Sequence, residues 1–281
     1  MADRPEMTVW RAAGAAFCAA SLLAPAARAA EEPADPDVLA YNLRLGSQAF
    51  GACYQFTTND IVHEQAAQLQ RMGSDIIKFS LEAGPRRKEL KTLTACVQAN
   101  PIYSILFDMP FRHYFAWTSV AAHSSGYWHK GPNPQQDRKE YEEIHAFTRY
   151  LLTRYSGTGK RFYLGNWEGD WLLLGTGQHG TNNPPPEAVL GMRSWLNARQ
   201  QAVDDAKRET PHTNVDVFAY AEVNRVRDAM RDRPGSNVRL VNAVLPFVTN
   251  IDYVSYSSYD AQNLNESELF KTLDYLAAPY I

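Results

Sequence analysis

The chain has 281 residues, 45% of them hydrophobic, which is enough for one large α/β domain or two small ones. Its formal net charge of −3 leaves no basic footprint, so we expect neither nucleic acid nor an anionic membrane surface as a partner. The 6 Trp and 15 Tyr residues suit a site that stacks flat faces, although both types are also common in cores.

The first 29 residues are typical of a cleavable secretory signal. A short polar opening precedes an apolar run from Ala12 to Pro25, and Ala27-Arg28-Ala29 is a small-x-small cleavage pattern. The run is shorter than the roughly 20 residues that a membrane-spanning helix needs, which disfavours an anchor. We expect cleavage near Ala29, a secreted or periplasmic protein, and an N-terminal lead-in over residues 30–44.

Strand and helix patterns alternate from residue 45 onward. Apolar, β-prone segments predict strands at 48–56, 75–81, 102–108, 161–166, 215–220 and 251–256. Between them, helical spacing predicts a helix capped by Asn59 or Asp60 and ended by Gly73. Further helices are expected around Leu90–Val97, over 138–155, from Pro184–Pro186 through Val203, and from Ser267 to Ala278.

Two long loops interrupt this alternation. One, from His113 to Gln136, is rich in aromatic residues, and the other, from Gly175 to Pro186, holds Gly, His, Asn and three consecutive prolines. Their length argues for a functional role.

The absence of hairpin turns predicts parallel strands with crossover helices. Both a doubly wound sheet and a closed barrel satisfy this pattern. The first strand lacks a Gly-rich phosphate turn, and the polar, aromatic loops follow strands, which favours a TIM (β/α)8 barrel. Only six of the eight units fit, so we expect an incomplete barrel domain over 45–281, with unpaired edge strands and poor solubility.

Cysteines and histidines show no metal or redox motif. Cys53 on the first predicted strand and Cys96 in a helical pattern fit either a disulfide or two buried thiols. The seven histidines lack H-x-H or H-E-x-x-H spacing, and we expect no metal and no cofactor.

The densest cluster of candidate site residues follows the strand at 161–166. Glu168 just beyond a barrel strand would project into the open mouth, between Trp167 and Trp171. Apolar indoles raise a carboxyl pKa by desolvating the ionised form, and they offer stacking surfaces to a sugar ring. Glu168 is therefore the candidate proton donor to a glycosidic oxygen. The alternative is a rim carboxylate in a salt bridge.

Two further strand ends contribute candidates. Glu222 and Asn224 are two residues apart on one face of an extended segment, where they could bind substrate or, for Glu222, supply a second carboxylate. An ion pair with Arg225 or Arg227 is the alternative. Tyr256 on the last predicted strand is a further candidate for substrate binding.

The Asn166–Glu168 element and the DYVSYSSYD segment at 252–260 resemble the retaining glycoside hydrolase clan on (β/α)8 barrels, which includes cellulases and β-mannanases. The resemblance spans about Leu45 to Asp260. It implies that Glu168 is the acid/base and that Asn166 binds the sugar 2-hydroxyl. In that clan the Asn and Glu are adjacent, whereas Trp167 separates them here. The clan's nucleophile follows strand seven, which the sequence does not reach.

We therefore expect an exported glycoside hydrolase-like enzyme that acts on a poly- or oligosaccharide. The alternatives are a non-catalytic carbohydrate-binding barrel protein and another exported barrel hydrolase. Neither the sugar nor the oligomeric state follows from the sequence.

Overall fold

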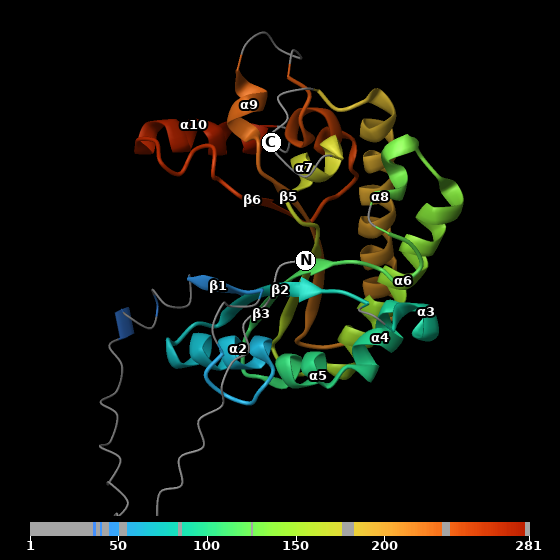
Figure 1. Ribbon diagram of the computed structural model, residues 1–281, viewed down its shortest axis with the longest axis vertical. Helices are drawn as coiled ribbons and strands as arrows, with labels where there is room; N and C mark the ends of the chain where they lie inside the picture. The colour runs from blue at the N-terminus through green and yellow to red at the C-terminus, as the bar shows by residue number, and fades with distance from the viewer. Residues whose placement is uncertain are drawn as a thin grey trace, which may run out of the picture.

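A single parallel sheet of six strands organises the molecule (Figure 1). The computed structural model describes residues 36–37, 40, 45–50, 55–83, 86–124, 126–175, 183–231 and 237–278. Neighbouring strands are consecutive in the chain and curl into a half-barrel. They are β1 (Gly46–Ala49), β2 (Ile76–Leu81), β3 (His113–Thr118), β4 (Arg161–Gly165), β5 (Asp216–Val223) and β6 (Tyr253–Tyr256).

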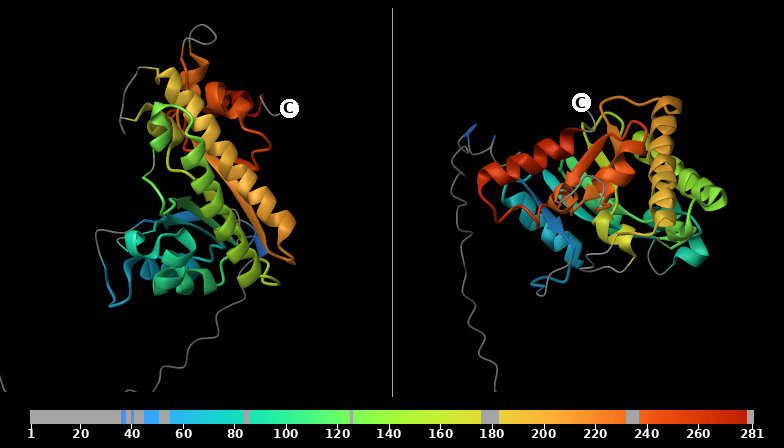
Figure 2. Two further views of the ribbon diagram at one scale, coloured as in Figure 1. Left: turned by 90° about the vertical axis from the view of Figure 1, so that its right-hand side faces the viewer. Right: turned by 90° about the horizontal axis from the view of Figure 1, so that it is seen from above.

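Crossover helices connect the strands, and the longest two, α6 and α8, run side by side along the outside of the sheet (Figure 2). The α-helices are α2 (Ile61–Arg71), α3 (Arg87–Leu90), α4 (Leu93–Ala99), α5 (Pro101–Asp108), α6 (Pro134–Arg154), α7 (Gly169–Leu174), α8 (Pro186–Glu209), α9 (Val226–Met230) and α10 (Glu266–Ala277). Shorter turns are η1 (Tyr127–Lys130), η2 (Leu240–Val244) and η3 (Leu245–Phe247).

Alternation along the strands separates a helix-facing side from a concave side. In β2, Ile77, Phe79 and Leu81 are buried, while the alternate residues Lys78 and Ser80 are only half-buried. The same alternation recurs in β3. Because neighbouring strands are in register, each side of the sheet forms a continuous surface.

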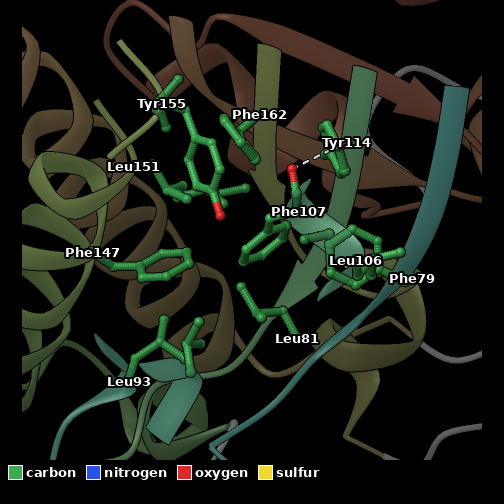
Figure 3. Close-up of a cluster of buried hydrophobic side chains, with 14 of the residues drawn as sticks. Phe79, Leu81, Leu93, Leu106, Phe107, Tyr114, Phe147, Leu151, Tyr155 and Phe162 are labelled. Atoms are coloured by element: carbon green, nitrogen blue, oxygen red, sulfur yellow. Dashed lines mark hydrogen bonds between the residues drawn. The ribbon is translucent and has the colours of Figure 1, made fainter. Parts of the chain in front are cut away.

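The helix-facing side carries the main hydrophobic core (Figure 3). Phe107 of α5 lies at its centre and makes edge-to-face contacts with the rings of Phe79, Tyr114 and Phe162. The Tyr114 hydroxyl donates a hydrogen bond to the Phe107 carbonyl over 3.1 Å. This packing joins α5 to three successive strands.

The concave side is filled by aromatic rings. The rings of Phe115 and Tyr163 stack with centroids 4.1 Å apart, and Phe218 and Tyr253 continue the row across β5 and β6. Gly165 is required beside this row, because a Cβ there would lie 2.2 Å from Cζ of Tyr220. The interior of the half-barrel is thus packed with side chains.

The strand expected at Ile102–Asp108 is wrong, because this segment forms helix α5. Pro101 occupies the first helical turn, and the Asn100 side chain caps it by accepting from the amide of Ile102 over 3.1 Å. The third strand is instead His113–Thr118, inside the segment expected to be a loop. Within the described residues, the sheet nevertheless has the expected six strands.

The strand expected at 48–56 is found at Gly46–Ala49, and several other predicted elements are confirmed with small changes of boundary. Asp60 caps α2 by accepting from the amide of Val62, and Gly73 follows the helix with a positive φ of 82°. Helix α6 begins four residues earlier than expected, at Pro134. Strand β5 extends to Val223, so that Glu222 belongs to the strand.

The segment expected to be a signal peptide (residues 1–29), most of the expected lead-in over 30–44, and Cys53 lie outside the described residues. Cys96 is a buried thiol whose pKa is raised by burial. Within the described ranges, no helix combines the length and the apolar character of a membrane span.

Candidate functional site

The candidate site lies where β4 and β5 end. Asn166, Trp167 and Glu168 follow β4, and helix α7 begins immediately afterwards at Gly169. A Cβ at Gly169 would lie 2.6 Å from the carbonyl oxygen of Glu222. Only glycine therefore permits this close approach of α7 to β5, which brings Glu168 next to the end of β5.

Asn166 extends the pairing of the two strands. Its Oδ1 accepts from the amide of Glu222 over 3.2 Å, and its Nδ2 donates to the carbonyls of Trp167 and Glu222. The side chain is buried, and both ends of its amide are engaged by the backbone. Asn166 therefore fixes the spacing between the chain before Glu168 and the segment that carries Glu222.

Glu168 is half-buried, and its pKa is raised by burial and by the negative charge of Glu222. The Lys78 charge and a hydrogen bond from Trp171 lower the pKa of Glu168 by smaller amounts. Trp167 and Trp171 are also half-buried, and the Arg225 guanidinium lies over the Trp171 ring, 5.1 Å from its centroid. The site thus combines a carboxyl group that favours its protonated form with two partly accessible indoles.

Glu222 has no exposed surface and is held by three side chains. Its Oε2 accepts from Nζ of Lys78 over 2.6 Å and from Nε1 of Trp117 over 2.9 Å. Its Oε1 accepts from the Ser257 hydroxyl over 2.7 Å. The ion pair expected with Arg225 or Arg227 is therefore formed with Lys78 instead.

Asn224 is not available at the concave side beside Glu168, because its buried side chain takes part in a hydrogen-bond network with Asp170. Its Oδ1 accepts from the amide of Asp170, while Asp170 accepts from the amides of Asn224 and Arg225. Asp170 also accepts from the amide of Leu240 over 2.7 Å. Burial raises the pKa of Asp170. The hydrogen bonds of Asp170 connect α7 to the end of β5 and to η2.

Tyr256 also lies apart from Glu168. It alternates with Ser255, which pairs with Glu222, and it therefore faces the opposite side of β6. There it packs against a second cluster of buried apolar residues, which includes Val223 and Leu276, and its hydroxyl donates to Asp260 over 2.5 Å. Burial and this hydrogen bond raise the pKa of Tyr256.

The structure adds side chains that the sequence analysis missed. They are Lys78 on β2, Trp117 on β3, Ser257 after β6, and Phe50 after β1. The Phe50 ring stacks on Trp117 with centroids 4.1 Å apart and an interplanar angle of 8°. One of these residues could have been found from the sequence: Lys78 is a single charged residue between the apolar residues Ile77 and Phe79 of a predicted strand.

In the part of the chain that the structure describes, no group of three or more His, Cys, Asp or Glu side chains is arranged to hold a metal ion. Comparison of the sequence with models of protein families and with curated proteins finds no match. The site is therefore interpreted from its own geometry.

Proposed function

We propose that this protein is an exported glycoside hydrolase-like enzyme in which Glu168 is the general acid/base. The observation that carries the proposal is the environment of Glu168, a half-buried carboxyl group at the end of a parallel strand with a raised pKa. A proton donor must remain protonated near the working pH, and a raised pKa moves Glu168 in that direction.

In the proposed reaction, Glu168 donates its proton to the glycosidic oxygen as the bond to the anomeric carbon breaks. The leaving sugar departs as a neutral alcohol, and Glu168 becomes a carboxylate. The glycosyl group, left electron-poor at its anomeric carbon, bonds to the oxygen of an incoming water molecule, and Glu168 takes a proton from that water, which restores the acid. The nearby Lys78 ammonium, which lowers the pKa of Glu168, stabilises the carboxylate stage of this cycle.

Trp167 and Trp171 are the proposed sugar platforms. Both flank Glu168 and keep part of their surface accessible. Indole faces bind the apolar face of a sugar ring and exclude water from one side of the site. Because Arg225 lies over the Trp171 ring, the opposite face of that indole is the one proposed for sugar stacking.

We further propose that the six-stranded half-barrel is part of a TIM-type (β/α)8 fold. Six parallel strands in sequential order, with the site at their carboxyl ends, support this assignment. The proposed location outside the cytoplasm rests on the signal-like sequence of residues 1–29.

A non-catalytic carbohydrate-binding protein is the second candidate. One observation favours it: Glu222, the carboxylate whose charge raises the pKa of Glu168, has no exposed surface. A glycosidase needs a second accessible carboxylate or an activated water molecule.

The two candidates differ in a simple experiment. The purified protein is incubated with a panel of poly- and oligosaccharides, and new reducing ends are measured alongside binding. Hydrolysis that is lost in Glu168→Gln supports the enzyme. Binding that is equal in wild type and Glu168→Gln, without any release of reducing ends, supports the binding protein.

A further inference from the structure

We propose that Glu222 is a positioning residue for Glu168 and not a second carboxylate that contacts the substrate. Lys78, Trp117 and Ser257 hold it as a buried carboxylate. The segment that carries Glu168 packs directly on it, because the Asn166 side chain hydrogen-bonds the backbone of Glu222 and a Cβ at Gly169 would lie 2.6 Å from the Glu222 carbonyl oxygen. This inference rests on the proposed function of Glu168. It also assigns a role to Lys78, Trp117 and Ser257, which hold Glu222 in place.

Burial and hydrogen bonding argue against a nucleophilic role for Glu222. A nucleophile must reach the anomeric carbon with a free oxygen, yet the side chain of Glu222 has 0% exposed surface. Both of its oxygens already accept hydrogen bonds, two at Oε2 and one at Oε1. Oε2 is thus occupied by two hydrogen bonds, and Oε1, which accepts one, has no exposed surface through which an anomeric carbon could approach it.

The positive charge of Lys78 offsets the free-energy cost of burying the Glu222 carboxylate. The two groups form a salt bridge of 2.6 Å, in which the Lys78 side chain is only 17% exposed. Removing one partner of such a buried pair leaves an uncompensated charge and destabilises the protein. The ammonium also lies 4.7 Å from the centroid of the Trp117 ring, a cation–π contact that fixes its position.

The cluster gathers side chains from most of the sheet. Lys78 comes from β2, Trp117 from β3 and Glu222 from β5, while Glu168 and Ser257 follow β4 and β6. The charge of Glu222 is therefore fixed relative to Glu168 by the curl of the whole sheet. Phe50 covers Trp117 by parallel stacking and shields this side of the cluster.

The charged groups that act on Glu168 are Glu222 and Lys78, and they act in opposite directions. The Glu222 carboxylate raises the pKa of Glu168, and the Lys78 ammonium lowers it by less. The pair consequently leaves a net bias toward protonated Glu168. Glu222 therefore acts on the proposed reaction through the protonation state of Glu168.

The test is a titration of the Glu168 carboxyl group by NMR in protein with ¹³C-labelled glutamate, because it does not require turnover. The variants are Glu222→Gln and the double variant Lys78→Met/Glu222→Gln, which removes both charges and so guards against misfolding. The matched control is Glu143→Gln, which alters another buried carboxylate, one that accepts from the amides of Leu93, Ala121 and Ala122.

We expect the pKa of Glu168 to be highest in the wild type and in Glu143→Gln, lower in the double variant, and lowest in Glu222→Gln. Where turnover is measurable, the basic limb of the pH–rate profile should move to lower pH in the same order. An unchanged Glu168 titration in Glu222→Gln would overturn the positioning role.

Glycosidase kinetics give a second way to contradict it. If Glu222→Gln loses turnover of substrates with good leaving groups and azide restores it without any change in the pH profile, Glu222 is a nucleophile. If the wild type shows no turnover but the titrations follow the expected order, the glycosidase proposal fails and the positioning of Glu168 stands.

Discussion

The Nζ atom of Lys78 lies 2.6 Å from Oε2 of Glu222, although 144 residues separate them in the chain. This contact crosses the concave side from β2 to β5, which are not neighbours in the sheet. It exists only because the sheet curls, and it links the fold directly to the candidate site.

Glu168 should make the stability of the folded protein depend on pH. The pKa of Glu168 is higher in the folded than in the unfolded protein. The stability that Glu168 contributes to the folded state is therefore fully present below the unfolded pKa and is lost as the pH rises through the folded-state pKa. Glu168→Gln, which is neutral at every pH, should therefore gain stability relative to wild type as the pH rises. Urea denaturation from about pH 4 to about pH 8 measures this difference.

Glu64 provides a control of opposite sign. Hydrogen bonds from Thr57 and from the Phe56 amide lower the pKa of Glu64, so its contribution is present above the unfolded pKa and is lost as the pH falls. Glu64→Gln should lose stability relative to wild type at neutral pH. The same pH trend in both variants would contradict the assigned environments.

Arg199 should be one of the most sensitive positions outside the site. Its guanidinium pairs with the buried Glu140 over 2.7 Å and donates to the carbonyls of Thr118 and Gly165, at the ends of β3 and β4. Arg199→Met leaves Glu140 without this partner and should lower the free energy of unfolding by about 3–5 kcal/mol.

The matched control for Arg199 is Arg138, which forms an exposed salt bridge of 2.7 Å with Glu142 on α6. Arg138→Met should change the free energy of unfolding by at most about 1 kcal/mol. Chemical denaturation of both variants gives the comparison. Equal effects would show that Arg199 does not support the strand ends as described.

Gly165→Ala should be destabilised by overpacking against Tyr220. The added Cβ would meet the ring at 2.2 Å, and the cost should be about 1–3 kcal/mol. In a Tyr220→Ala background the same change should cost less, because the ring is absent. A double-mutant cycle in urea measures this coupling, and additive effects would contradict the close approach.

The strands and helices were predictable from the sequence wherever caps and alternation agreed. Asp60 and Gly73 marked the ends of α2, and the alternation in β2 was clear. The exchange of α5 and β3 arose because Ile102, Ile105 and Phe107 suit a strand, whereas the cap at Asn100 and Pro101 decides for a helix. His113–Thr118 lacks a polar–apolar alternation, because both faces of β3 are covered by other side chains.

Glu168 could be selected from the sequence because the strand end and the tryptophans lie next to it in the chain. The roles of Lys78 and Trp117 could not, since their contacts with Glu222 arise from the curl of the sheet. The face of the sheet that Tyr256 occupies depends on the exact register of β6. Ser255 is paired with Glu222, so its neighbour Tyr256 lies on the opposite face.

Export should leave a mature chain that begins near Ala30. Sequencing of the N-terminus of secreted or periplasmic protein checks this prediction. Recovery of the exported protein with Met1 still present would contradict cleavage.

The most direct test of the central claim compares wild type with Glu168→Gln on two kinds of substrate, with the exposed Glu142→Gln as a control. One substrate is an unactivated oligosaccharide, and the other is an aryl glycoside with a good leaving group. For the unactivated substrate, kcat should fall by about 10²–10⁴-fold, the usual contribution of acid catalysis. The fall should be smaller for the aryl glycoside, and if the reaction proceeds with retention through a glycosyl-enzyme, azide should partly restore its turnover. Hydrolysis of both substrates by Glu168→Gln at wild-type rates would contradict the assignment of Glu168 as the proton donor.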